Sequence, residues 1–226
     1  MSPPAREGGG AAGPAPPDTP LDTLTRAMAD LAPRGVLLGC RVIAAGDGDL
    51  LLAEEQRVIA TRHPASRRAS GAARHLARGL LAAQGHPAVS IGRGPHGAPL
   101  WPDGVVGSLA HDDTVAVAAI ASAADWRALG IDVEPAEPLA EDLGALVVTA
   151  ADTVGSVDDP LTGRLVFAAK EAVYKAVHTL DGAVLDYDDI AVDLPARCAR
   201  TSTGHAAALS ICTHPKIIVL ATVTPV

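Results

Sequence analysis

Residues Gly130-Ile131-Asp132-Val133-Glu134 follow the apolar run 115–120 and precede two closely spaced prolines. This pattern predicts a short strand that ends at its prolines. Side chains alternate between the two faces of a strand, so Asp132 and Glu134 are expected on the same side. Two neighbouring carboxylates repel each other unless a cation lies between them, and oxygen ligands of this kind suit Mg²⁺. A solvated acidic strand end is the alternative interpretation of the five residues taken alone.

The clearest helical pattern lies C-terminal to this strand, from Leu161 to Thr179. The helix carries Lys170, Glu171 and Lys175, and the last two are four residues apart, on one side. An ordinary surface ion pair has the same spacing. Asp181-Gly182 is expected to end the helix. Three antiparallel strands are predicted to follow, at 190–192, 206–211 and 217–223.

A second long helix is predicted N-terminal to the acidic strand, over residues 65–83. Almost no acidic residue interrupts its four arginines, Arg67, Arg68, Arg74 and Arg78. A solvated basic face usually explains such a run, but in an acidic protein it also suggests an anion site. Residues 85–107 are rich in Gly and Pro and predict a long loop or hairpin. Gly107-Ser108-Leu109-Ala110-His111 follows, and a histidine in such a place is more often structural than a ligand contact.

The remaining elements complete an α+β pattern. Residues 1–20 are mainly Pro, Gly and Ala and are expected to be a disordered tail. Asp22 is expected to cap a helix over 23–31, a buried strand is predicted over 35–45, and a turn at 46–49 leads into a helix over 50–62. Residues 141–151 fit a short helix or a loop. Because each half offers a long helix and several strands, we expect two similar α+β halves, at 21–124 and 125–226.

Composition excludes several classes of protein. The chain has 226 residues and a net charge of −8, which argues against a nucleic-acid-binding protein. Aromatic residues make up 2% of the chain, so stacking on bases is not expected. Cys40, Cys198 and Cys212 form no CxxC pair, which indicates neither a zinc site nor a disulfide framework. With no secretory pattern and no apolar run of membrane-spanning length, we expect a cytoplasmic protein.

Three motifs stand in order along the chain: Gly107 to His111, Gly130 to Glu134, and Phe167-Ala168-Ala169-Lys170-Glu171-Ala172-Val173-Tyr174-Lys175. Gly97-Ala98-Pro99 and Trp101-Pro102-Asp103-Gly104 precede them. Together they resemble the 4′-phosphopantetheinyl transferase superfamily, in particular the group with the enterobactin-synthetase component D and the actinobacterial carrier-protein activators. The resemblance covers residues 35–225 and is sharpest over 65–178. Each motif is weak alone, so the order and spacing carry the resemblance.

The resemblance implies two related α+β halves with coenzyme A in the cleft between them. It also implies transfer of the phosphopantetheine arm of coenzyme A to a serine of an apo acyl or peptidyl carrier protein, which releases adenosine 3′,5′-bisphosphate. Residues that match the metal ligands of the family are Asp132, Glu134 and Glu171, for Mg²⁺. Residues that match its coenzyme A contacts are Arg67, Arg74, Arg93, His111, Lys170 and Lys175.

The expected mechanism is Mg²⁺-dependent phosphoryl transfer with Asp132, Glu171 and Lys175 as the catalytic residues. Lys175 would neutralise or protonate the leaving phosphate. Glu171 is a metal ligand in this interpretation, and it has a second possible duty as general base toward the incoming serine. Residues 140–166 are the region where we expect the carrier protein to dock, through a small hydrophobic groove and with Arg164 as a candidate basic contact.

The sequence departs from the family pattern at two places. Ala110 stands where Ser or Thr usually precedes the histidine, which removes one hydroxyl donor to a phosphate. Ala69-Ser70-Gly71 stands where an acid–Phe pair is usual, and this leaves the register of Arg67 and Arg68 open. Two alternatives are therefore a non-catalytic regulator that binds coenzyme A or a carrier, and a Mg²⁺-dependent pyrophosphate hydrolase. Because one chain supplies both halves, a monomer is the expected state.

Overall fold

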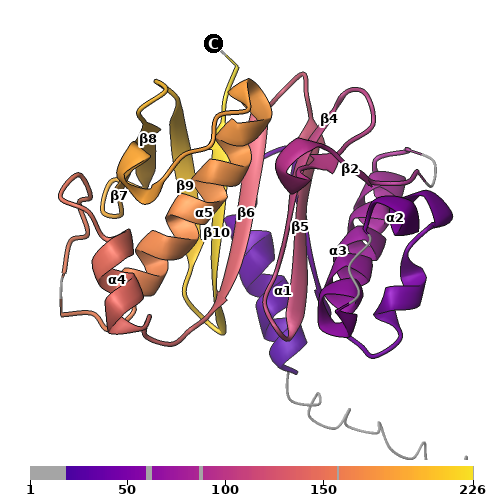
Figure 1. Cartoon of the computed structure of the whole chain (residues 1–226), viewed down its shortest axis with the longest axis horizontal. Helices are drawn as coiled ribbons and strands as arrows, with labels where there is room; N and C mark the ends of the chain where they lie inside the picture. The colour runs from indigo at the N-terminus through magenta and orange to yellow at the C-terminus, as the bar shows by residue number, and fades with distance from the viewer. Residues whose placement is uncertain (1–18, 60–62, 87–88, 157, 226) are drawn as a thin grey trace, which may run out of the picture.

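The computed structural model describes residues 19–59, 63–86, 89–156 and 158–225. Over these residues the chain has the predicted α+β architecture, in which two antiparallel sheets are each covered by a 20-residue helix (Figure 1). The first sheet has the strand order β1-β5-β4, and the second has the order β6-β10-β9-β8-β7. No helix in the described part of the chain is long and apolar enough to cross a membrane.

The first sheet consists of β1 (Val36–Val42), β4 (Val105–His111) and β5 (Val115–Ser122). Helix α3 (Pro64–Ala83) packs on it through Ala77 and Leu81, because its apolar residues recur at helical spacing. Shorter elements surround α3: η1 (Asp47–Leu50), α2 (Ala53–Val58), β2 (Gly92–Arg93), η2 (Pro95–Gly97) and β3 (Pro99–Leu100). Strands β2 and β3 form a small hairpin within the Gly- and Pro-rich region.

The prediction of one continuous helix over 50–62 is wrong. Leu51 and Leu52 have extended backbone conformations and separate η1 from α2. Leu51 is buried, and the Leu52 N–H donates to the Glu55 carboxylate, so this Glu side chain starts a new helix. Residues 60–62 of the predicted helix lie outside the described residues.

The second sheet consists of β6 (Ala128–Pro135), β7 (Ile190–Asp193), β8 (Cys198–Thr201), β9 (Ala206–Cys212) and β10 (Lys216–Val223). Helix α5 (Thr162–Asp181) covers one face and ends at Gly182, which has a left-handed conformation as the Asp-Gly signal predicts. Helix α4 (Glu141–Val147) and the turn η3 (Tyr187–Asp189) pack beside α5. Strand β8 was missed because its four residues show no apolar alternation.

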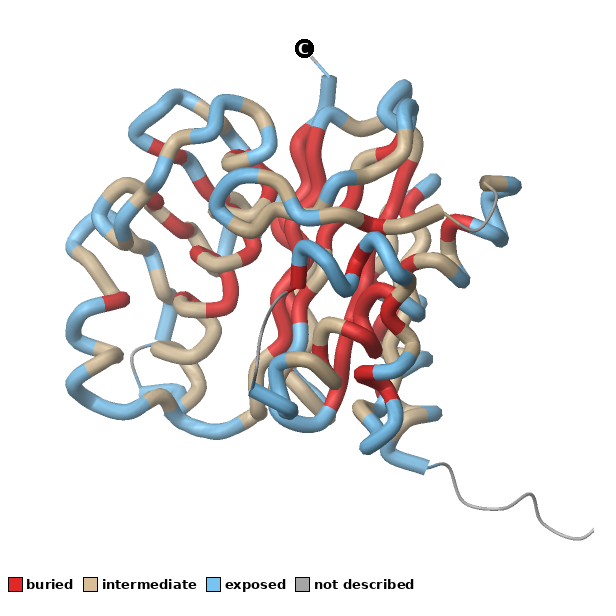
Figure 2. Tube along the Cα trace, turned by 45° about the vertical axis from the view of Figure 1, so that its right-hand side comes forward, coloured by how far each residue is buried: buried red, intermediate tan, exposed pale blue. Residues whose placement is uncertain are grey.

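Helix α1 (Pro20–Leu31) lies beneath both sheets. Its cap is Thr19, and Asp22 is the third helical residue, whose carboxylate accepts the Thr19 N–H, so the predicted Asp22 cap is corrected. Leu24 and Met28 pack in one core with residues from the inner faces of both sheets, among them Val117, Ala119, Ile131, Val133, Ile218 and Leu220. Figure 2 shows long buried stretches in the strands of the two sheets. This shared core joins the two halves into one body.

Most of the predicted N-terminal tail and the predicted boundary between the two halves are not tested by the structure. Residues 1–18 of the predicted disordered tail lie outside the described residues, whereas Thr19 caps α1 and Pro20 begins it. The boundary predicted between residues 124 and 125 falls in the connection between β5 and β6 and stays a prediction.

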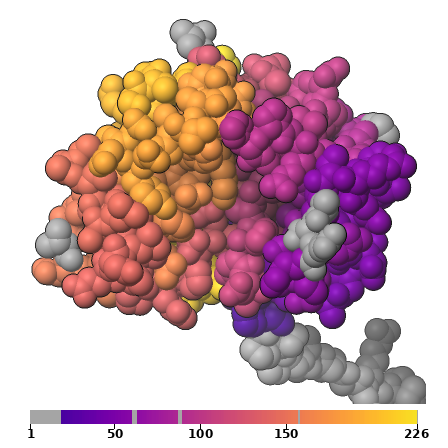
Figure 3. Space-filling view, in the orientation of Figure 1, coloured from indigo at the N-terminus to yellow at the C-terminus, as the bar shows by residue number. Residues whose placement is uncertain are grey.

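The edge strands of the two sheets, β4 and β6, lie next to each other. The Ile131 N–H donates to the hydroxyl of Ser108 at 3.0 Å, which links the two edges. Beside them the Lys216 ammonium of β10 pairs with Asp112, which follows β4. In the space-filling view the two halves meet along a seam that is hollowed near its centre (Figure 3). The predicted site residues lie on β4, β6, α3 and α5, except Arg93, which lies on β2.

Candidate active site

An acidic centre forms where α5 crosses β6. Gly130 permits the close contact, since a Cβ atom at this position would lie 1.8 Å from the Ala172 carbonyl oxygen of α5. Alternation along β6 turns Gly130, Asp132 and Glu134 toward α5, as predicted for the two carboxylates, and turns Ile131 to the shared core.

The ammonium of Lys175 meets this acidic centre. Its Nζ lies 2.6 Å from Oδ1 of Asp132 and also donates to the Ile131 carbonyl at 3.3 Å. Asp132 is 6% exposed. Because Asp132 is shielded from water, solvent screens its attraction to the partly exposed Lys175 less than it screens a surface ion pair.

The three acids influence one another electrostatically. Burial raises the pKa of Asp132, and the charges of Lys175 and His111 lower it only in part. Burial also raises the pKa of Glu171, which Lys175 lowers and Asp132 raises further. The pKa of Glu134 is raised by burial and by Asp132, against the lowering effect of Arg164. Asp132 therefore lies close to both other carboxylates, and the site favours a positive charge among them.

The metal ligand set is not assembled in advance. No group of three or more His, Cys, Asp or Glu side chains in the described ranges is placed to hold a metal ion. Glu134 instead pairs with Arg164 at 2.7 Å. Oδ2 of Asp132, however, is buried and has no hydrogen-bond partner among the described residues. A buried carboxylate oxygen without a partner is costly, and its chemistry fits a hard cation such as Mg²⁺.

A cationic pocket adjoins the acidic centre. A cavity of about 360 Å³ is lined by Arg74, Arg93 and His111, together with Ser66 and Ser70. Burial lowers the pKa of Arg74, and so do the nearby charges of Arg93 and Arg78, whereas Glu55 raises it. Positive charges crowded in this way favour an anion between them.

A second cavity, of about 570 Å³, shares Ser66 and His111 with the first and adds Arg68. His111 thus stands where both cavities meet and lies close enough to Asp132 to lower the pKa of that acid. The structure brings together Arg74, Arg93 and His111 as predicted neighbours of one pocket. Of the two arginines whose register was open, Arg68 lines the second cavity, and a contact of either one with coenzyme A stays a prediction. Arg67 instead packs beside the turn at Gly48: a Cβ atom added at Gly48 would lie 3.3 Å from Cγ of Arg67.

Lys170 lies elsewhere than the resemblance implied. It is 1% exposed, and its ammonium pairs with Asp152 at 2.7 Å and donates to the Tyr187 carbonyl at 2.8 Å. Nζ of Lys170 also lies 3.5 Å from the hydroxyl oxygen of Thr149, to which it donates. The physical reason is helical geometry, because Lys170 is one residue from Glu171 and so points about 100° away from it around α5. The expected contact of Lys170 with phosphate is therefore corrected to a structural ion pair.

Arg164 and Ala110 also differ from expectation. The guanidinium of Arg164 binds Glu134 and the carbonyl groups of Glu137 and Pro138, so it is not a free basic contact for a carrier. Ala110 is buried in the shared core, on the face of β4 opposite His111. A hydroxyl at this position would not face the cationic pocket, so its absence does not remove a phosphate donor there.

Sequence reasoning missed Glu55, Ser108 and Asp152 as residues that hold the site together. Each is buried and binds a backbone N–H of a distant element, as in the contacts of Ser108 with Ile131 and of Asp152 with Val192. The only signal for Glu55 was an acid in the first turn of a short helix, and such acids are usually solvated.

Comparison with known proteins agrees with this geometry. A family model described as the 4′-phosphopantetheinyl transferase N-terminal domain matches residues 54–121, and one for the 4′-phosphopantetheinyl transferase superfamily matches residues 128–219. The chain is 41% identical over 138 residues to 4′-phosphopantetheinyl transferase Npt of Nocardia iowensis, which covers 60% of this chain and 62% of that protein.

Two further relatives are similar over shorter or comparable stretches. Identity is 36% over 142 residues with 4′-phosphopantetheinyl transferase PptT of Mycobacterium tuberculosis, covering 61% of this chain and 63% of that protein. It is 33% over 114 residues with enterobactin synthase component D of Salmonella typhimurium, covering 46% and 47%. The matches thus span less than two thirds of the length of these relatives. Since the two family models together cover more than half of the chain, on both sides of the cleft, the chain belongs to the 4′-phosphopantetheinyl transferase superfamily.

Proposed function

We propose that this protein transfers 4′-phosphopantetheine from coenzyme A to a serine hydroxyl of an apo acyl or peptidyl carrier protein. The serine oxygen forms a bond to phosphorus, the pyrophosphate P–O bond breaks, and adenosine 3′,5′-bisphosphate leaves. The observation that carries this proposal is the position of His111. It lines the cationic pocket, and it lies close enough to Asp132 of the acidic centre for its charge to lower the pKa of that acid. A substrate with a pyrophosphate and a separate terminal phosphate requires two such neighbouring sites.

At the nucleotide end, Arg74, Arg93 and His111 would bind the 3′-phosphate of coenzyme A. A phosphate monoester carries a charge of about −1.5 to −2 at neutral pH, which suits a pocket with two guanidinium groups. Arg68 would contact the same nucleotide from the second cavity. These contacts supply affinity for the substrate in its ground state, so their loss should raise KM more than it lowers kcat.

At the acidic centre, Asp132 with Glu134 and Glu171 would hold Mg²⁺. The buried, unpartnered Oδ2 of Asp132 supports this assignment, and so do the raised pKa values of Glu171 and Glu134, to which burial and the charge of Asp132 contribute. A bound Mg²⁺ would supply neutralisation of the pyrophosphate charge and polarisation of the phosphorus. Glu134 is paired with Arg164, so its carboxylate would have to leave that ion pair to serve as a ligand.

Lys175 would neutralise charge on the leaving phosphate, and Glu171 would take the proton of the attacking serine. Lys175 already holds its ammonium against Asp132 and would neutralise the leaving phosphate. Glu171 is our candidate for removal of the serine proton, because burial raises its pKa above that of an ordinary glutamate; this duty applies when Glu171 is not a ligand of Mg²⁺, which would lower that pKa. Lys170 would act only indirectly, by fixing the backbone of Tyr187 against α5.

The rest of the substrate has room in the same cleft. A cavity of about 590 Å³ is lined from both halves, by Trp101 and Gly107 on one side and by Leu129 and His178 on the other. His178 follows Lys175 by about one turn of α5, so this cavity lies beside the same helix as the acidic centre. The extended, uncharged pantetheine arm fits such a lining. The carrier proteins we propose as partners are those of fatty-acid, polyketide or nonribosomal peptide synthesis, and one copy of the chain would suffice.

The test is incubation of the protein with coenzyme A, Mg²⁺ and an apo carrier protein, followed by intact mass measurement. Attachment of phosphopantetheine to the carrier is the expected result. Release of phosphopantetheine without a carrier would instead establish the hydrolase, and binding of coenzyme A without either product would establish the regulator.

The metal assignment has its own test. Replacement of Asp132 by Asn should lower kcat at saturating coenzyme A by about 100-fold or more, because a charge-stabilising contact made at the reacting group is lost. Added Mg²⁺ should raise the melting temperature of the wild-type protein and not that of the Asp132→Asn protein. Full turnover by Asp132→Asn, or an equal thermal response of both proteins to Mg²⁺, would contradict the assignment.

A further inference from the structure

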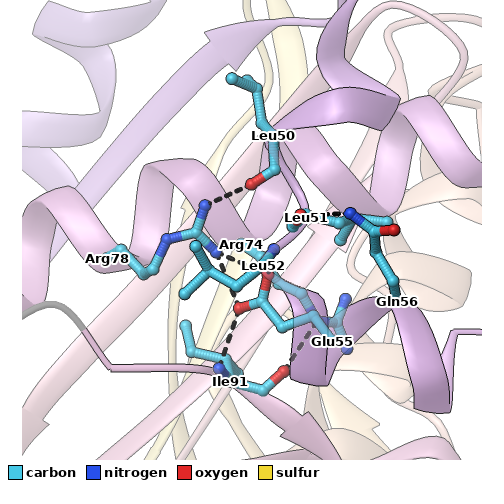
Figure 4. Close-up of polar contacts among 8 residues, drawn as sticks. All are labelled: Leu50, Leu51, Leu52, Glu55, Gln56, Arg74, Arg78 and Ile91. Carbon is cyan, nitrogen blue, oxygen red and sulfur yellow. Dashed lines mark hydrogen bonds and ion pairs between the residues drawn. The ribbon is translucent and has the colours of Figure 1, made fainter.

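Glu55 is buried in the N-terminal half and touches no part of the cationic pocket directly. It is 0% exposed, although it belongs to the short surface helix α2. Both of its carboxylate oxygens lie 2.7 Å from Nη1 of Arg78 on α3, and they also accept the N–H groups of Leu52 and Ile91 (Figure 4). One carboxylate thus ties together α2, α3 and the segment that leads into β2.

Ile91 connects this carboxylate to the cationic pocket. Its N–H donates to Glu55 at 2.9 Å, and its carbonyl oxygen accepts Nε–H of Arg74, also at 2.9 Å. Because Ile91 precedes the ladder of β2 and β3, side chains have to satisfy its backbone groups. The next residues of the chain are Gly92 and Arg93, so Ile91 fixes the start of the strand that carries the second arginine of the pocket.

Arg78 is held in place by the same contacts. Its Nη2 donates to the Leu50 carbonyl at 2.7 Å, while its Nη1 is bound by Glu55. Arg78 and Arg74 are one helical turn apart on α3, and the charge of Arg78 acts on Arg74. Without the Glu55 carboxylate, the poorly solvated guanidinium groups of Arg74 and Arg78 would repel each other, and the exposed Arg93 would add a third like charge nearby.

We propose that Glu55 is a positioning residue for the anion pocket, which holds Arg74 and Arg93 in binding geometry through Ile91 and neutralises Arg78. Four groups take part, three arginines and one glutamate, and together they leave two net positive charges. That balance matches a phosphate monoester dianion. The inference rests on the proposed function, in which this pocket takes the 3′-phosphate of coenzyme A.

The decisive variant removes both partners of the ion pair, as Glu55→Leu together with Arg78→Leu. The double replacement leaves the net charge of the cluster unchanged, so a change in anion affinity reports geometry and not charge. Replacing both ions by apolar groups also avoids an unpaired buried charge, which makes folding of the variant far safer than with either single replacement. The matched control is Arg41→Leu together with Asp47→Leu, a partly buried pair on β1 and η1 whose acid also accepts a backbone N–H.

Calorimetry would measure binding of adenosine 3′,5′-bisphosphate and of adenosine 5′-phosphate to each protein. The Glu55/Arg78 variant should bind the bisphosphate about tenfold more weakly and the 5′-monophosphate unchanged, because only the former reaches the pocket with a 3′-phosphate. The control variant should keep the wild-type affinity for both. A purely structural role for Glu55 would change both affinities or neither, and either result would overturn the inference.

Binding and transfer fail independently in this design. A wild-type protein that binds the bisphosphate through Glu55 but transfers nothing to a carrier would refute the proposed function and keep this inference. If the wild-type protein modifies a carrier while the Glu55/Arg78 variant binds the bisphosphate normally, the proposed function stands and this inference is refuted. Equal wild-type affinity for the two nucleotides would overturn the inference, since no 3′-phosphate pocket would then exist.

Discussion

Lys170 and Lys175 come from one helical motif and have opposite environments. Lys170 is enclosed in an ion pair with Asp152, whereas the side chain of Lys175 keeps 28% of its surface exposed beside Asp132. Their separation of five positions along the helix places the two ammonium groups at different angles around α5. A lysine buried in this manner belongs to the stability of the fold, and a half-open lysine at an acidic centre is available to a substrate.

Replacement of each lysine by Met should separate these roles. Lys170→Met should lower the free energy of unfolding by about 3–5 kcal/mol, because Asp152 is left buried and unpaired. Lys175→Met should also lower the stability, because buried Asp132 loses its partner, but its distinguishing effect should be a kcat for transfer lower by about 100-fold, because charge stabilisation at the phosphate is lost.

Denaturant titration and a transfer assay with saturating coenzyme A would check both expectations. A Lys170→Met protein as stable as the wild type would show that the Asp152 pair is not structural. A Lys175→Met protein with normal kcat would remove Lys175 from the proposed mechanism.

At the scale of elements, the contact between α5 and β6 decides whether an acidic centre exists. The two elements approach at Gly130, where any Cβ atom would collide with the backbone of Ala172 and Ala176. Backbone atoms in a packed helix cannot move aside as a flexible side chain can, so the collision would push the helix as a unit. Glu171 and Lys175, on the same turns of α5, would then move away from Asp132.

Gly130→Ala should therefore lower the free energy of unfolding by about 3 kcal/mol and abolish measurable transfer. The matched control is Gly79→Ala on α3, where a Cβ atom meets nothing within 4 Å. That replacement should stabilise the protein by about 0.5–1 kcal/mol, since alanine has less freedom than glycine in the unfolded chain. Thermal and denaturant unfolding would measure the stability of both variants. Equal changes in the free energy of unfolding for Gly130→Ala and Gly79→Ala would contradict this view of the contact.

At the scale of the whole molecule, a shared core and two polar links hold the halves together. The core beneath α1 fixes the two sheets, and the Ser108–Ile131 and Lys216–Asp112 contacts fasten their neighbouring edges. Burial raises the pKa of Asp112, but the Lys216 ammonium and the N–H groups of Val115 and Thr114 outweigh it, and the net pKa is lowered. Asp112 therefore favours folding in its ionised form.

The sign of the pH dependence follows from this lowered pKa. The stabilising contribution of Asp112 is present above the pKa of the unfolded chain, near 3.8, and is lost as pH falls through the lower pKa of the folded state. Asp112→Asn should cost about 2 kcal/mol of unfolding free energy at pH 7, and the difference from wild type should shrink below pH 4.

Unfolding measured from pH 7 to pH 2 would check this prediction. A penalty for Asp112→Asn that persists unchanged at pH 2 would contradict it. Lys216→Met should cost a similar amount at pH 7, and the double variant should lose less than the sum, because the two residues share one interaction.

The sequence alone determined the α+β class, the two long helices, the acidic strand and the order of the motifs. These depend on periods of 2 and 3.6 residues and on glycine and proline signals, all of which are local. Arg74, Arg93 and His111 could be named because the motifs of the family carry them. The helix predicted over 50–62 failed because a tertiary contact, the burial of Leu51 and Glu55, broke it into two shorter elements.

Only the tertiary structure decided which charged residues face the cleft. Lys170 and Glu171 are neighbours in sequence, yet Lys170 forms an ion pair with Asp152, whereas the charge of Asp132 raises the pKa of Glu171. Glu55 and Glu54 are adjacent acids, and only the first meets Arg78 and Ile91 from distant segments. The physical reason is that the partner of a charge depends on which parts of the chain meet around it, and local pattern contains no record of those encounters.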